Sequence, residues 1–183
     1  MRTYTILTSV VLLTLAGCGQ PTATTPSAQP AEVAATALGE LARVHLVGDL
    51  YVAGQPSQAD LEAASAMGVK TVVSYRKPGE SVGFDEAKVV ADLGMTFVAE
   101  PWKAPAELTD DALAGMRKTL GSASRPMLVH CGSANRAGAV WAAYRALDEG
   151  VAIDTAIKEA KQIGLSSEAF EARIREYVAS QTK

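Results

Sequence analysis

The stretch VHCGSANRAG, residues 129–138, decides the fold, because it joins a short apolar segment to a long helical pattern through a loop of small residues. Residues 126–130 (PMLVH) are predicted to form a buried strand that ends at Cys131. The following helix is predicted over 137–149, since Gly150 ends it. Four residues separate Cys131 from Arg136, which opens the helix. A strand, a small-residue loop and a helix N-terminus in this order predict an anion-binding site.

Each part of this stretch suits phosphate chemistry. The backbone N–H groups of the loop, together with Arg136, are predicted to hold a phosphate; the loop residues are Gly132, Ser133, Ala134 and Asn135. The same positive surroundings favour a thiolate over a thiol at Cys131. A thiolate beneath a bound phosphate is placed for in-line attack, which predicts a cysteinyl-phosphate intermediate. The alternative is that Cys131 is a small buried apolar residue and Arg136 a surface charge.

Strands and helices alternate on both sides of this stretch. Strands are expected at 44–47, 50–53, 69–75 and 95–99, the first two as a hairpin, and helices at about 57–68, 84–93, from 109, at 154–163 and at 168–179. The pattern predicts a single α/β domain with a mostly parallel central sheet flanked by helices. Ligands of such folds bind where strands end and helices begin, which is where Cys131 lies.

The N-terminus has the pattern of an export signal. Residues 1–17 carry Arg2 and a short apolar run, and Leu15-Ala16-Gly17-Cys18 resembles a bacterial lipobox, in which the cysteine is lipidated. We expect residues 1–17 to be a lipoprotein signal peptide, 18–39 a flexible tether starting at lipidated Cys18, and 40–183 the folded domain. An ordinary signal peptide with an incidental cysteine remains the alternative. The signal and lipobox predict an exported, periplasm-facing lipoprotein, and Gly rather than Asp at residue 19 resembles the enterobacterial sorting pattern for the outer membrane.

Composition restricts the function classes. The chain has 183 residues, with 20 acidic and 17 basic side chains and a net charge of -3, which argues against a nucleic-acid partner. Two cysteines and two histidines are too few for a disulfide scaffold or a histidine-rich metal site. We therefore expect neither a metal nor another cofactor.

The loop resembles that of the cysteine-dependent tyrosine and dual-specificity phosphatases, which have five residues between Cys and Arg where this chain has four. The shorter spacing and the Asn-Arg pair are similar to the phosphatase-like domain of the bacterial β-lactamase-hydrolase-like family. VAGQPS (52–57), DL (60–61), GVKTV (68–72) and RKPGE (76–80) extend the resemblance over about residues 44–180. It implies a tyrosine/dual-specificity phosphatase-like fold and phosphomonoester hydrolysis.

Three positions depart from the family pattern. Ala134 stands where the family has Gly, and an alanine with positive φ costs about 1 kcal/mol or forces another loop shape. Ala137 replaces a Ser or Thr that helps the thiolate leave. The Asp that protonates the leaving group in the family is missing from the loop 100–108. Glu100 is the first candidate for the acid that protonates the leaving group, and Asp110, Asp85 and Glu80 are the others.

Three neighbouring residues have two interpretations each. His130 is expected to orient the loop or tune the thiolate, or else to be a hydrogen-bonded core histidine. Arg76, at the end of a strand, either helps bind phosphate or forms a salt bridge with Glu80. Trp102 either walls the cleft or packs within its loop.

Three functions are compatible with these features. The first is an exported, membrane-anchored phosphatase acting on a phosphorylated protein or a small phosphoester. The second is a rhodanese-like sulfurtransferase that uses a Cys131 persulfide. The third is an anion-binding module with weakened catalysis.

Overall fold

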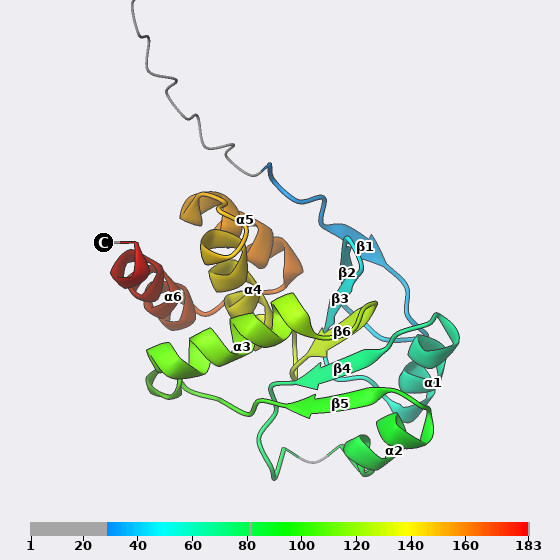
Figure 1. Ribbon diagram of the computed structural model, residues 1–183. Coiled ribbons are helices and arrows are strands. Elements are labelled where there is room, and N and C mark those ends of the chain that lie inside the picture. Colours follow the sequence, from blue (N-terminus) through cyan, green and yellow to red (C-terminus); the bar gives the residue numbers. More distant parts are fainter. Residues whose placement is uncertain (1–28, 81, 183) are drawn as a thin grey trace, which may run out of the picture.

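The computed structural model describes residues 29–80 and 82–182, and in them a six-stranded sheet lies between two layers of helices (Figure 1). The strands are β1 (Ala34–Thr36), β2 (Val44–Val47), β3 (Leu50–Ala53), β4 (Thr71–Ser74), β5 (Thr96–Ala99) and β6 (Met127–His130). The helices are α1 (Gln58–Ala66), α2 (Glu86–Asp92), the short 3-10 helix η1 (Pro105–Glu107), α3 (Asp110–Ser122), α4 (Asn135–Leu147), α5 (Ile153–Ile163) and α6 (Glu168–Gln181).

The sheet has the strand order β1-β2-β3-β6-β4-β5. β1, β2 and β3 pair antiparallel, whereas β3, β6, β4 and β5 form a parallel block. β6 lies at the centre, with Val129 paired to Val52 on one side and to Val73 on the other. All four of its residues are buried. Cys131 therefore leaves the sheet at the middle of its carboxyl edge, and the predicted fold class is confirmed.

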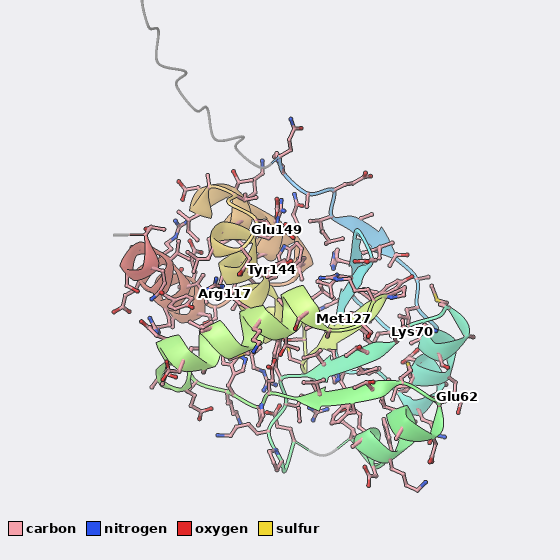
Figure 2. The ribbon with its side chains drawn as sticks, viewed as in Figure 1. Glu62, Lys70, Arg117, Met127, Tyr144 and Glu149 are labelled. Atoms are coloured by element: carbon pink, nitrogen blue, oxygen red, sulfur yellow. The ribbon has the colours of Figure 1, made fainter. Side chains whose placement is uncertain are left out.

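The two faces of the sheet have separate cores. Val72 and Leu128 pack beneath α1 and α2, while Val73 and Val129 belong to the larger core under α3, α4, α5 and α6 (Figure 1). The alternation follows from the two-residue period of strand side chains. Lys70 and Met127 mark the opposite, amino edge of the sheet, where β4 and β6 begin (Figure 2).

Helix caps agree with the sequence pattern. Ser57 and Asp60 form the predicted capping box at α1, and Thr109 accepts a hydrogen bond from the backbone N–H of Ala112 at α3. α4 begins at Asn135, two residues before the predicted start. The loop is therefore tighter than expected, and Arg136 already belongs to the first turn of the helix.

The folded domain begins earlier than residue 40, which corrects the predicted tether boundary. β1 pairs with the edge strand β2, and Leu38 is only 1% exposed. Further upstream, Ala31 donates its N–H to Glu159 and Gln29 accepts from Arg145, at 2.8 and 2.9 Å. An edge strand is held by backbone hydrogen bonds, so it needs no strong apolar pattern. The predicted signal peptide and Cys18 lie outside the described residues, among which no helix has the length and apolar character needed to cross a bilayer.

Candidate active site

The loop of residues 131–136 follows β6 and is anchored from both sides. The Cys131 side chain is 1% exposed, and its backbone N–H reaches the carbonyl of Ala53 at 3.4 Å. Gln55 donates its backbone N–H to the carbonyl of Gly132 at 3.3 Å, and Gly54 bridges Ser133. The end of β3 therefore holds the loop in place, and the predicted nucleophile and loop residues converge at the start of α4.

Ala134 adopts the left-handed conformation expected of a glycine, with φ of 65°. The loop thus keeps its shape, at a cost of about 1–2 kcal/mol for a residue with a Cβ. The end of α5 accommodates the methyl group, because a Cβ at Gly164 would lie only 3.0 Å from that of Ala134. The Asn135 side chain accepts hydrogen bonds from the backbone N–H groups of Ser166 and Ser167. Asn135 therefore ties α4 to the α5–α6 connection and contributes only its backbone to the predicted cradle.

Arg136 is held in one orientation by four hydrogen bonds. Its Nη1 donates to the carbonyls of Tyr75 and Trp102 at 2.8 and 2.7 Å, and to Glu80 Oε1 at 2.8 Å. Its Nη2 donates to Glu80 Oε2 at 2.6 Å. Burial disfavours the charged guanidinium, but the bonds to Glu80 and the nearby Cys131 raise the pKa of Arg136 overall. Arg136 is therefore a fixed cation beside Cys131.

Glu80 is the counterion of Arg136, which excludes it as the acid that protonates the leaving group. The hydrogen bonds from Arg136 lower the pKa of Glu80 from 4.5 to about 2. A carboxyl with this pKa is ionised near neutral pH and has no proton to give.

The Glu80–Arg136 pair makes stability depend on acid pH. A pKa lowered in the folded state stabilises the fold above the ordinary value of 4.5, and this contribution disappears as the pH falls to about 2. We expect wild type to exceed Glu80→Gln in free energy of unfolding by about 1–2 kcal/mol above this window, allowing for solvent screening. Urea denaturation at a series of pH values measures this difference. A difference that stays constant down to pH 2 would contradict the assignment.

His130 belongs to a polar network behind the nucleophile. It is fully buried, and its Nε2 lies 3.2 Å from Glu86 Oε1. Gln55 donates to the same carboxylate oxygen at 2.8 Å and accepts from Arg76. Burial alone would raise the pKa of Glu86, but the adjacent His130 and the hydrogen bond from Gln55 lower it. This chain of contacts, of which the sequence pattern gave no indication for Gln55 and Glu86, orients the end of β6.

Arg76 contacts Glu80 rather than lying in the loop. It donates to the backbone carbonyl of Glu80, and its Nε lies 3.7 Å from the Glu80 carboxylate. Of the two interpretations, the salt bridge with Glu80 is the one that the structure contains. Arg76 thereby supports the carboxylate that holds Arg136.

The remaining acid candidates make contacts outside the loop. Glu100 accepts a hydrogen bond from Thr119 of α3 at 2.7 Å, and burial raises its pKa. It lines a cavity against α3 to which no residue of the 131–136 loop contributes. Asp110 pairs with Arg173, and Asp85 caps α2.

Trp102 packs in the core through its side chain. Its side chain is 1% exposed and contacts the ring of Phe170 edge-on, with the ring centroids 4.9 Å apart. Only its backbone carbonyl reaches the site, as an acceptor for Arg136.

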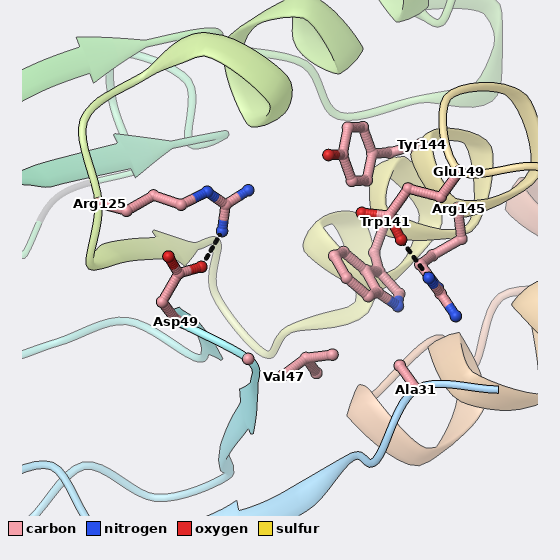
Figure 3. Close-up of a pocket in the computed structure, with 9 residues that line it drawn as sticks. Ala31, Val47, Asp49, Arg125, Trp141, Tyr144, Arg145 and Glu149 are labelled. Carbon is pink, nitrogen blue, oxygen red and sulfur yellow. Dashed lines mark hydrogen bonds and ion pairs between the residues drawn. The ribbon is translucent and has the colours of Figure 1, made fainter. Parts of the chain in front are cut away.

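Two other cavities lie outside the loop, one beside the site and one at the opposite edge of the sheet. One of about 440 Å³ adjoins the site and is lined by Arg76, Glu80 and Glu86 together with Phe84 and Phe97. Another, of about 380 Å³, lies where β3 and β6 begin, at the edge of the sheet opposite Cys131 (Figure 3). There Asp49 pairs with Arg125, and Arg145 with Glu149, so its charged groups have partners.

The sequence model of one family matches residues 42–148, from the start of the β2–β3 hairpin through α4. That family is the beta-lactamase hydrolase-like protein, phosphatase-like domain. The chain belongs to this family. The match contains the loop 131–136. It also contains Glu80, the partner of Arg136, and Glu86, the partner of His130. Membership in a phosphatase family confirms the resemblance inferred from the sequence and makes the chain a phosphatase-family enzyme.

One curated relative matches this chain in sequence. The beta-lactamase hydrolase-like protein of Agrobacterium fabrum is 29% identical over 103 residues, which are 54% of this chain and 24% of that protein. The chain thus matches about a quarter of that relative's length.

Among solved structures, nma1982 from Neisseria meningitidis, named as a candidate phosphatase, is 25% identical with a TM-score of 0.60, covering 78% of this chain and 99% of its own. P. aeruginosa TpbA is 22% identical with a TM-score of 0.64, covering 85% and 91%. Kinase associated phosphatase, at 13% identity and a TM-score of 0.65 over 84% and 97%, shares the fold.

Proposed function

We propose that this domain is a phosphomonoester hydrolase of the tyrosine/dual-specificity type that works through a phosphate ester of Cys131. The observation that carries the proposal is the loop 131–136, in which a buried cysteine lies beside a fixed arginine at a helix N-terminus. Helix dipole, backbone amides and guanidinium together favour a bound dianion.

Arg136 retains donors for the substrate. Its bonds to Glu80, Tyr75 and Trp102 use both Nη1 protons and one Nη2 proton. The Nε proton and the second Nη2 proton remain to bind two phosphate oxygens as a planar fork. Glu80 thus orients the guanidinium without consuming the edge that the phosphate needs.

In the first chemical step the Cys131 thiolate attacks phosphorus, and the bond from phosphorus to the leaving oxygen breaks with its electron pair on that oxygen. In the second, water attacks the phosphocysteine and frees the thiolate and inorganic phosphate. The carboxyls proposed as acids contact other groups in the described residues. Aryl phosphates, whose leaving group needs the least protonation, are therefore the substrates that we propose for this site. A structure of TpbA in complex with pTyr supports this choice.

The cellular setting is a separate part of the proposal. The lipobox-like segment ending at Cys18 supports an exported domain anchored to a membrane by lipid, facing the periplasm. Its substrate would then be a phosphorylated protein or a small phosphoester in that compartment.

Trapping the intermediate tests the mechanism. Reduced protein is mixed with an aryl phosphate and quenched in denaturant, and its peptides are analysed by mass spectrometry. We expect phosphate on the peptide that contains Cys131. A persulfide on Cys131, with thiocyanate formed from thiosulfate and cyanide and no aryl-phosphate turnover, would overturn the proposal in favour of a sulfurtransferase. Phosphate binding without either turnover would indicate an anion-binding module.

A further inference from the structure

A cavity of about 280 Å³ lies between the segment after β5 and α3. Glu100, Trp102 and Glu107 line one side, and Asp111, Gly115 and Met116 of α3 line the other. Its wall is mixed, with an apolar part around Met116 and a carboxylate-rich part around Glu100.

The charge in this cavity is not balanced. Glu107 pairs with Lys77 at 2.9 Å, but within residues 29–80 and 82–182 neither Glu100 nor Asp111 has a cationic partner. The Oε2 atom of Glu100 is buried without a hydrogen bond in the described part of the chain. A buried carboxylate is costly unless it is paired, so the cavity favours a positively charged occupant.

The cavity adjoins the proposed phosphate site through Trp102. Trp102 contributes to its wall; the side chain of this residue is buried, and its indole N–H has no partner among the described residues. The backbone carbonyl of the same residue accepts the 2.7 Å hydrogen bond from Arg136. Trp102 therefore belongs both to the surroundings of Arg136 and to the wall of the cavity.

We propose that this cavity binds a lysine or arginine side chain of the phosphoprotein substrate, close in sequence to the phosphorylated residue. The proposal rests on the phosphatase function argued above and specifies its substrate class. The aliphatic stem of the basic side chain would pack on the apolar part of the wall around Met116, and its charged head would bind Glu100 and Asp111.

Peptide kinetics test this specificity. In a set of phosphotyrosine peptides, a single lysine is moved along an otherwise neutral sequence. The best-placed lysine is expected to raise kcat/KM about tenfold over the lysine-free peptide, the effect of one partly buried ion pair.

Two variants assign the effect to the cavity. Glu100→Gln removes the charge, and Gly115→Leu fills the space, since an added Cβ at Gly115 meets nothing within 4 Å. Both variants are expected to hydrolyse the best-placed lysine peptide and the lysine-free peptide with nearly equal kcat/KM. Gly121→Ala, on the same helix but outside the cavity, is the matched control and is expected to keep the preference.

The outcomes separate this proposal from the one on which it rests. Equal hydrolysis of all peptides, or a lysine preference that survives both variants, overturns the basic-residue pocket and leaves the phosphatase standing. A uniform fall in kcat for every substrate in Glu100→Gln would assign Glu100 to leaving-group protonation instead. Absence of hydrolysis of aryl phosphate and of all peptides overturns both proposals.

Discussion

Replacing Cys131 with serine is expected to lower kcat for aryl-phosphate hydrolysis by at least about 10³-fold, because the hydroxyl is a far weaker nucleophile at neutral pH than a thiolate. The loop should survive, since serine is nearly isosteric and the carbonyls of Ala53 and Gly132 are bound through backbone atoms. Steady-state hydrolysis of an aryl phosphate under reducing conditions, in wild type and Cys131→Ser, measures the effect.

Binding provides the control for this variant. Inorganic phosphate and vanadate should raise the melting temperature of Cys131→Ser, because Arg136 and the loop amides remain. Vanadate should also inhibit the wild type. If Cys131→Ser hydrolyses the aryl phosphate as fast as wild type, the cysteinyl-phosphate mechanism is wrong.

Arg136→Lys is expected to lower kcat/KM by roughly 10²–10³-fold, the size reported for removing one preorganised transition-state donor. Lysine carries three donors at one point, whereas Arg136 binds Glu80 in a fork, two carbonyls and the proposed phosphate at once. The variant can satisfy Glu80 or the phosphate, but not both in the same geometry.

Arg145→Lys is a matched control for this prediction. Arg145 lies on the same helix and forms a buried ion pair with Glu159 at 2.8 Å, towards the sheet edge opposite Cys131. Its replacement is expected to lower the free energy of unfolding while kcat/KM of the folded protein stays near that of wild type. Equal losses of kcat/KM in the two folded variants would show that Arg136 acts only through the stability of α4.

The core of the site was predictable because it is continuous in sequence. β6, the loop and α4 follow one another within residues 127–147, so the cysteine, the small residues and the arginine lie together by local geometry. Backbone propensity also located the hairpin, the capping box at Ser57 and the cap at Thr109. The strain at Ala134 was expected from the resemblance, because the family has a glycine at this position, and Ala134 does have a positive φ.

The partners of these residues were harder to predict because they come from distant segments. Glu86 lies 44 residues before His130, and nothing in the pattern of α2 distinguishes it from a solvated charge. Glu80 was a candidate acid from its sequence position, but its two bonds from Arg136 lower its pKa and keep it ionised near neutral pH. Glu100 has the sequence position of an acid, but its rotamer and its bond to Thr119 depend on where α3 packs.

The sequence by itself determined the α/β class, the family and the cysteine–arginine loop, since these depend on periodicity, turn chemistry and short-range spacing. Tertiary structure alone decided that residues before 40 join the sheet, that Glu80 binds both Arg136 and Arg76, and that Glu100 lines a cavity beside α3. The physical reason is that pairing, burial and the protonation state of a carboxyl depend on neighbours far away in the chain. Local propensity carries no information about those neighbours.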